Sequence, residues 1–311
     1  MSAASSRDPL AEIRSLSGLD RYLGLVESKL GASVSGHAGR VAAAGSQALA
    51  SGGKRLRPLL VFLSTATGTE PQVASGVAVE LVHLATLVHD DLLDRAPVRR
   101  GRPSTWSEFG EQSAVAGGDY LFARAFAALA ETGDPASLEI LAGASLALAH
   151  GEALQRQQRF DSSVSVEAYL ERCKLKTGSL FAAACRLGAG DPSSSLGEFG
   201  ELLGVAFQIV DDVLDCSGET IETGKVPGTD LHDGVPTLPL LLAAADDEVV
   251  REALEGRSRE GALARVAATG ALERSLETAA ELAQAATEHL NGQAHCRELE
   301  ILARAVVERK H

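Results

Sequence analysis

The sequence of 311 residues predicts an all-α fold. Alanine and leucine dominate long segments, glycine and proline fall at segment boundaries, and no stretch alternates apolar and polar residues for long enough to indicate a sheet. Hydrophobic residues make up 45% of the chain, which is ample for a buried core. Because no linker or low-complexity tract interrupts this pattern, we expect one helical domain over residues 1–311, with 1–8 disordered.

Local signals place the helices. Two of them have clear starts, at Asp134 followed by Pro135 and at Ser165 followed by Glu167. Two loops rich in glycine and proline, 95–107 and 217–236, each follow a helix end rich in aspartate. The expected helices span 9–30, 33–50, 55–67, 71–93, 112–131, 135–158, 165–188, 195–216, 236–245, 247–255, 259–269, 272–290 and 295–309.

Charge and composition exclude several classes of function. The chain has 29 Lys and Arg against 42 Asp and Glu, a net charge of −13, and no basic run that would bind nucleic acid or an anionic membrane. The longest uncharged stretch, 41–53, is too short and too polar to be a transmembrane segment. Arg7 and Asp8 stand where a signal peptide would be apolar. Without a CxxC pair, we expect a cytoplasmic protein with four reduced cysteines, Cys173, Cys185, Cys216 and Cys296.

Two aspartate clusters carry the strongest chemical signal. Each has the spacing DDxxD at the end of an apolar helix, where the negative end of the helix dipole disfavours anions. On a helix the first and third carboxylates lie on one face, about 6 Å apart. This arrangement predicts bound Mg²⁺ that bridges to substrate phosphates, although a solvated acidic helix end is the alternative. The predicted metal ligands are Asp90, Asp91, Asp94, Asp211, Asp212 and Asp215.

Cationic residues accompany these clusters. Lys54, Arg55 and Arg57 follow two glycines at a helix start, which is a favourable anion site but also a frequent surface pattern. Further cations are Arg99, Arg100, Lys176 and Lys225. His83 stands seven residues before Asp90 and therefore on the same side of the helix, where it is either a ligand or a core histidine.

In these motifs the chain resembles the trans-isoprenyl diphosphate synthases of the polyprenyl synthetase family, in particular those that make geranylgeranyl or longer products. The resemblance covers about residues 40 to 240 and is carried in order by Gly-Gly-Lys54-Arg-Leu-Arg57-Pro, His89-Asp90-Asp-Leu-Leu-Asp94, Arg99-Arg100-Gly-Arg-Pro, Gly117-Gly-Asp119, Lys176-Thr177-Gly, Phe207-Gln208-Ile-Val-Asp211-Asp-Val-Leu-Asp215 and Gly224-Lys225-Val-Pro-Gly-Thr-Asp230.

The resemblance implies a helical bundle of the isoprenoid synthase type with a central cavity, with 217–236 as an active-site loop. It implies an allylic diphosphate held between the aspartate clusters through Mg²⁺, and a homodimer built on long helices. Asp90, Asp94, Arg99, Lys176 and Asp211 would be catalytic. The allylic diphosphate would contact Arg99, Lys176, Thr177, Gln208 and Lys225, and isopentenyl diphosphate would contact Lys54, Arg57, His83 and Arg100.

Two other readings remain open. A class I terpene cyclase shares the fold and one aspartate motif, but it lines its cavity with aromatic rings, and aromatic residues are only 4% of this chain. A non-catalytic subunit of a heterodimeric synthase would lack the full motifs, whereas both clusters are intact here.

Product length depends on where the growing chain stops. In the family, members that stop at fifteen carbons tend to carry bulky aromatics at the positions of Ala85 and Thr86, one turn before the metal cluster. Here both side chains are small, and the next candidates, Leu81 and Val82, are not aromatic. We therefore expect a prenyltransferase product of at least twenty carbons, tending to thirty or more, unless a side chain from another helix closes the pocket.

Overall fold

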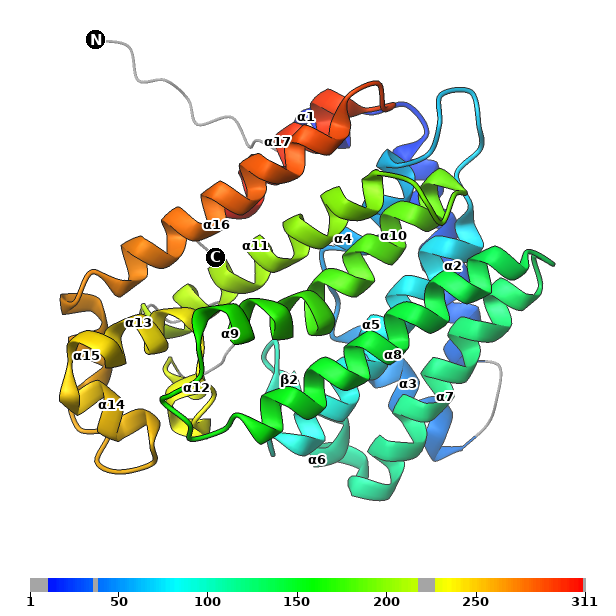
Figure 1. Cartoon of the computed structure of the whole chain (residues 1–311). Coiled ribbons are helices and arrows are strands. Elements are labelled where there is room, and N and C mark those ends of the chain that lie inside the picture. The colour runs from blue at the N-terminus through cyan, green and yellow to red at the C-terminus, as the bar shows by residue number, and fades with distance from the viewer. Residues whose placement is uncertain (1–10, 36–38, 218–226, 310–311) are drawn as a thin grey trace, which may run out of the picture.

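The structure, a computed structural model, describes residues 11–35, 39–217 and 227–309, and it is almost entirely helical (Figure 1). The predicted all-α fold is confirmed. Within the described ranges the only strands are β1 (Val98–Arg99) and β2 (Arg102–Pro103), which form one antiparallel hairpin. The predicted disorder of residues 1–8 lies outside the described residues.

The first half of the chain forms the helices that surround the first aspartate cluster. They are α1 (Ala11–Arg14), α2 (Leu19–Ser35), α3 (Arg40–Ala50), α4 (Leu56–Leu63), α5 (Val73–Leu93), α6 (Thr105–Phe109), α7 (Glu111–Ala130) and α8 (Pro135–Gln157).

The second half supplies the helices around the second cluster. They are α9 (Val166–Cys173), the π-helix η1 (Lys174–Gly178), α10 (Ser179–Ala189), α11 (Leu196–Cys216), α12 (Thr229–Asp233), α13 (Leu238–Asp246), α14 (Glu248–Leu254), α15 (Ala262–Ala268), α16 (Ala271–Thr287), the 3₁₀-helix η2 (Glu288–Leu290) and α17 (Cys296–Val307).

Helices α5 and α11 form the centre of the bundle. Both are apolar on most sides, so each needs helices packed around it to remove that surface from water. Helix α5 packs along α7 and also against α2 and α4, while α11 lies between α10 and α16 (Figure 1). Each central helix carries a DDxxD cluster at its C-terminal end, so packing of the core places the two clusters.

The predicted helix starts are confirmed by capping hydrogen bonds. The Asp134 carboxylate accepts from the backbone N–H groups of Ala136 and Ser137, and the Ser165 hydroxyl accepts from Ala168 N–H at 3.2 Å. The predicted helix 9–30 is wrong. The chain breaks between α1 and α2 at Gly18, whose φ of +86° a helix cannot contain.

Both predicted loops contain structure that the sequence did not reveal. The β1–β2 hairpin and α6 occupy most of 95–107, and α12 lies within 217–236. Local signals missed them because two-residue strands and five-residue helices are too short to show a period.

The four cysteines are free, as predicted. Cys173, Cys185 and Cys216 are buried in the core, and Cys296 is half-buried. They therefore behave as small apolar side chains.

Helix α5 is long and apolar enough to cross a membrane by length and composition alone. However, 61% of its most apolar stretch is buried inside the protein, as in a core helix. It is the one helix of this kind in the ranges that the structure describes.

Candidate active site

A cavity of about 590 Å³ lies between the start of α4, the middle of α5, the β1–β2 hairpin and the C-terminal part of α11. It brings together residues that are far apart in the sequence. Its wall includes the predicted site residues Lys54, Arg57, His83, Arg99, Arg100, Gln208, Asp211, Asp212 and Asp215.

Arg57 lies at the start of α4 and is half-buried in the wall of the cavity. Its guanidinium carbon lies 5.0 Å from the centre of the Phe181 ring, and its Nε has no hydrogen-bond acceptor among the described residues. Burial lowers the pKa of Arg57 to about 10. The side chain is therefore still cationic at neutral pH, and its charge acts in a poorly solvated place.

Arg55 and Arg57 have different surroundings. Arg55 donates to Glu80 at 2.9 Å and also to Glu27, so its charge is largely neutralised within the protein. Arg55, which Lys54 separates from Gly52 and Gly53, has a left-handed φ of +50°. This turn points consecutive residues in different directions.

Arg100 forms the cationic wall of the cavity together with Lys54 and Arg57, and His83 lies beside them. Arg100 donates to the carbonyl oxygen of Gly52, which connects the hairpin to the glycine turn. Burial, followed by the charges of Arg57 and Arg100, lowers the pKa of His83 well below its ordinary value. His83 is therefore neutral at pH 7 and offers a hydrogen bond without adding positive charge.

The three aspartates of the first cluster have unlike environments. Asp91 is buried and accepts from Arg99 Nε at 2.8 Å and from its Nη2 at 2.6 Å. Burial raises the pKa of Asp90, although Lys176 opposes this effect. Asp94 is the exposed C-cap of α5. The middle carboxylate therefore holds an arginine, and the outer two lie at the end of the helix.

The π-helix η1 carries Lys176 and Thr177. Such π-helical turns are rare in proteins, and many of those that occur lie at functional sites. Lys176 Nζ lies 2.6 Å from Glu152 Oε2 on α8. A Cβ on Gly151 would lie 2.6 Å from the Lys176 backbone nitrogen, so glycine is required for η1 to approach α8 this closely. Burial lowers the pKa of Lys176, but Asp90 and Glu152 raise it by more.

The middle carboxylate of the second cluster is also committed to protein partners. Asp212 is buried and accepts from Tyr169 Oη at 2.7 Å and from Gln208 Nε2 at 2.8 Å. Gln208 Oε1 in turn accepts from Thr177 Oγ1 at 2.7 Å. Burial raises the pKa of Asp212 to about 6. The predicted residues Thr177 and Gln208 are thus brought together in one hydrogen-bond chain.

Asp215 and Asp211 complete the second cluster. Asp215 accepts from the backbone N–H groups of Thr229 and Asp230 at 3.2 and 3.0 Å and so fixes the start of α12. Asp211 is exposed and pairs with Arg309, which follows α17. The predicted Lys225 lies outside the described residues.

The donor set suits Mg²⁺ in the way that phosphate-dependent enzymes hold it. Among the described residues, no three carboxylate, imidazole or thiol groups converge on one point, so the protein alone forms no closed metal cage. Mg²⁺ instead favours one or two carboxylates completed by waters and substrate phosphates. Asp211, which already attracts a guanidinium cation, fits that role.

Comparison with known proteins decides the family. The sequence profile described as polyprenyl synthetase matches residues 39–269. The chain belongs to the polyprenyl synthetase family. The resemblance predicted from the motifs is therefore confirmed.

Relatives within this family are named for long polyprenyl products. Heptaprenyl diphosphate synthase component 2 of Geobacillus stearothermophilus is 38% identical over 269 residues, which are 81% of this chain and 84% of that protein. Nonaprenyl diphosphate synthase of Mycobacterium tuberculosis is 42% identical over 202 residues, or 62% and 60% of the two chains. The predicted activity, a trans-prenyltransferase with a product of at least twenty carbons, is confirmed at this level.

Solved structures of the family share the fold. The decaprenyl diphosphate synthase of Rhodobacter capsulatus superimposes with a TM-score of 0.86 at 33% identity, covering 94% of this chain and 98% of that one. A polyprenyl synthase from Caulobacter crescentus, solved with calcium and isoprenyl diphosphate, gives a TM-score of 0.85 at 33% identity over 100% of both chains. The isoprenoid synthase architecture expected from the sequence is confirmed.

The predicted chain-length residues lie in the packed core of α5. Leu81, Val82 and Ala85 are fully buried, and Thr86 is half-buried with its hydroxyl donating to the His83 carbonyl. The face of α5 that lines the cavity carries Glu80, His83 and Leu87 instead. The assignment of product length to Leu81, Val82, Ala85 and Thr86 stays a prediction.

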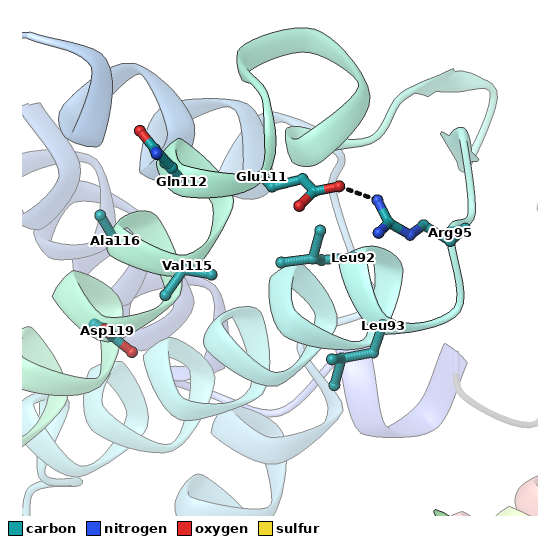
Figure 2. A pocket seen from close by; sticks show the side chains of 8 residues that line it. All are labelled: Leu92, Leu93, Arg95, Glu111, Gln112, Val115, Ala116 and Asp119. Atoms are coloured by element: carbon teal, nitrogen blue, oxygen red, sulfur yellow. Dashed lines mark hydrogen bonds and ion pairs between the residues drawn. The ribbon is translucent and has the colours of Figure 1, made fainter.

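A second pocket lies behind the end of α5, between that helix and the start of α7 (Figure 2). Leu92 and Val115 face each other across it, and the Arg95–Glu111 ion pair closes one side (Figure 2). None of the predicted site residues lines this pocket. It is therefore separate from the cavity described above.

Three residues of the site were not predicted from the sequence, namely Glu152, Tyr169 and Arg309. Glu152 stands beside Gly151, a pairing that gives only a weak signal. Tyr169 and Arg309 lie 43 and 98 residues from the aspartates that they contact. Only the packing of helices brings such pairs together, and no local pattern records it.

Proposed function

We propose that this protein is a Mg²⁺-dependent trans-prenyltransferase that adds isopentenyl diphosphate to an allylic diphosphate. The observation that carries the proposal is one cavity with a wall of half-buried arginines at one side and an acidic helix end at the other. Two anionic substrates that repel each other in water would find separate, complementary places in it.

The allylic diphosphate is assigned to the space between the two aspartate clusters. Asp90, Asp91 and Asp94 on one side and Asp211, Asp212 and Asp215 on the other would hold Mg²⁺. Of these, Asp91, Asp212 and Asp215 also accept hydrogen bonds from the protein, and Asp211 is paired with Arg309. Bound Mg²⁺ would supply positive charge that stabilises the departing diphosphate.

Cations of the chain share that task. Arg99, fixed by Asp91, and Lys176, paired with Glu152, place permanent charges beside the leaving group. Lys225 belongs to the same proposal. Because these charges are fixed before the reaction, they stabilise the transition state without reorganisation.

Isopentenyl diphosphate is assigned to Lys54, Arg57, His83 and Arg100. These groups lie together in the cavity wall, where low solvation strengthens the attraction between the charge of Arg57 and a bound phosphate. Neutral His83 donates one hydrogen bond and leaves the cationic side chains to carry the charge.

The reaction follows from this placement. The allylic carbon–oxygen bond breaks and its electron pair leaves with the diphosphate. The double bond of isopentenyl diphosphate then attacks the allylic cation, and a proton passes to the released diphosphate. The Thr177 hydroxyl donates a hydrogen bond to Gln208 Oε1, so the lone pairs of the hydroxyl oxygen remain available to stabilise the cation.

The product is proposed to contain thirty or more carbons. Relatives named as heptaprenyl, octaprenyl and nonaprenyl diphosphate synthases support this length. Small side chains at Ala85 and Thr86, followed by Leu81 and Val82, leave the metal-binding helix without an aromatic floor.

A class I terpene cyclase is less well supported. Phe207 is the one aromatic side chain among the residues that line the cavity, so few rings would stabilise a migrating cation. A second diphosphate pocket would also have no purpose in a cyclase.

Product sizing tests the proposed function. The purified protein is incubated with isopentenyl diphosphate, farnesyl diphosphate and Mg²⁺, and the products are separated by chain length. We expect polyprenyl diphosphates of thirty or more carbons and no product in excess chelator. A cyclised hydrocarbon, or full activity in chelator, would contradict the proposal.

The proposed assembly is a cytoplasmic homodimer. Helices α7 and α8 expose Val115 (46% exposed) and Leu146 (74% exposed), which a partner's long helices would cover. The name "component 2" of the Geobacillus relative raises the alternative of a second, different subunit. Light scattering of the purified chain and cell fractionation test these two points, and a monomer that is active only with another subunit would contradict the homodimer.

A further inference from the structure

Arg309 reaches the second aspartate cluster from a distant part of the chain. It follows α17, which packs against α11 and α16. Its Nη2 donates to Asp211 Oδ1, and its guanidinium carbon lies 4.4 Å from the centre of the Phe207 ring. Because Phe207 and Asp211 are one turn apart on α11, both contacts lie on one face of that helix.

The arginine is only partly satisfied in this position. Its side chain is 17% exposed, whereas that of Asp211 is 46% exposed, so the pair lies at the open edge of the cavity. Its Nε is buried without an acceptor among the residues that the structure describes. An ion pair with an exposed carboxylate and an unsatisfied donor is held weakly and can be exchanged.

The contact also places one cation where another is expected. In the second cluster, hydrogen bonds from the protein engage Asp212 and Asp215, whereas Asp211 is paired with Arg309. A guanidinium bound to Asp211 neutralises its charge, and a divalent cation at the same oxygen would meet electrostatic repulsion from it.

We infer that Arg309 is a resident cation of the second cluster, which occupies Asp211 in the metal-free enzyme and must leave it when a divalent metal binds. The inference rests on the proposed metal-dependent function. Stacking on Phe207 holds the side chain near the exchange site, so the exchange needs a local rotation and no movement of α17. Metal affinity at this cluster is therefore set partly by a residue outside both DDxxD motifs.

Direct metal binding tests the inference. Mn²⁺ alone is titrated into the purified protein, and free Mn²⁺ is measured by electron paramagnetic resonance. We expect Arg309→Gln to bind Mn²⁺ about three- to tenfold more tightly than wild type at the site that Asp211→Asn removes, since a competing ion pair is worth about 1 kcal/mol. Arg309→Lys, which keeps the charge, should fall between the two.

A matched control separates competition from net charge. Arg304 is exposed on α17, five residues before Arg309, so Arg304→Gln makes the same charge change away from Asp211. Its Mn²⁺ affinity should stay within about twofold of wild type because solvent and salt screen a distant charge. Circular dichroism of all variants establishes that they are folded.

The outcomes are distinguishable from failure of the proposed function. Unchanged Mn²⁺ affinity in folded Arg309→Gln, or equal tightening in Arg304→Gln, would overturn the inference. So would an increased Michaelis constant for isopentenyl diphosphate with unchanged Mn²⁺ affinity, since the arginine would then serve the substrate. If wild type and Asp211→Asn bind Mn²⁺ equally, the proposed metal role of Asp211 itself fails.

Discussion

The two DDxxD clusters are identical in spacing but differ in what surrounds them. At the end of α5, Asp91 is neutralised by the cationic Arg99. At the end of α11, Asp212 is surrounded by the uncharged donors Tyr169 and Gln208. Burial raises the pKa of Asp212 to about 6, although the hydrogen bonds from Tyr169 and Gln208 and the charge of Arg172 oppose this effect.

This difference separates the carboxylates by task. In both clusters the middle aspartate is buried and connects its helix to the surrounding structure, whereas we expect the first aspartate to face the substrates. The two copies of the motif therefore differ in the side chains that stabilise their middle aspartates. The following predictions test that division, beginning with the largest expected effect.

Loss of a first aspartate should have the largest effect. We expect Asp90→Ala and Asp211→Ala each to lower kcat about 10³-fold, because a metal-binding carboxylate is removed at a site of developing charge. Steady-state kinetics in Mg²⁺ measures this, and circular dichroism should show unchanged helicity. Asp20→Ala, at an exposed position on α2, is the control and should keep wild-type turnover. Full activity in either cluster variant would contradict the proposed metal-binding role of that aspartate.

The cationic wall should affect one substrate only. We expect Arg57→Ala to raise the Michaelis constant for isopentenyl diphosphate about 100-fold, because a buried charge–phosphate contact is lost, with less than about a threefold change for the allylic substrate. Arg55→Ala should have a smaller kinetic effect, since Arg55 is bound to Glu27 and Glu80. Equal effects of Arg57→Ala on both substrates would contradict the assignment.

The middle aspartate of the first cluster should matter for stability. We expect Asp91→Asn to lower the free energy of unfolding by about 2–3 kcal/mol, because Arg99 is left largely buried without its counter-charge. Urea denaturation measures the change. Asp94→Asn, at the exposed cap of the same helix, should change it by less than about 0.5 kcal/mol. Similar losses in both variants would show that burial does not separate these carboxylates.

The second cluster should give the protein a distinctive pH dependence. Between about pH 4 and 6 the folded protein binds a proton at Asp212 that the unfolded chain does not, because burial raises the pKa of Asp212 to about 6. The unfolding free energy should therefore fall by about 1–3 kcal/mol as pH rises through this window. Denaturation in chelator measures the slope, and Asp212→Asn should flatten it. An unchanged slope in that variant would assign the titration to another group.

The smallest effect on rate is expected from the chain-length residue. Ala85→Phe should move the main product toward fifteen carbons while leaving the metal ligands unchanged. Because Ala85 is fully buried, the larger ring should also cost about 1–3 kcal/mol of stability. Product chromatography and a thermal melt measure the two changes. A folded variant with the wild-type product profile would place the floor of the tunnel elsewhere.

Much of the fold was predictable from local signals. The capped starts at Asp134 and Ser165 and the long apolar α5 and α11 were read from composition and period alone. The break at Gly18, the short α6 and α12, and the π-helix η1 were not. Their conformations depend on single positive φ angles or on tertiary contacts, and both leave little trace over a few residues.

The sequence by itself determined which chemistry this protein can perform. The two DDxxD runs, the glycine-led cations before α4 and the basic hairpin after α5 specify the residue types and their local spacing, and they identified the family. Spacing along one helix is a property of the chain and needs no folded context.

Only the tertiary structure decided which of those residues are available. The partner of each aspartate, Arg99 at Asp91, Tyr169 at Asp212 and Arg309 at Asp211, arrives from another part of the chain. Burial and neighbouring charge, which set pKa and metal affinity, act through space and not along the chain. Two motifs of identical spacing therefore acquired different hydrogen-bond and ion-pair partners when the helices packed.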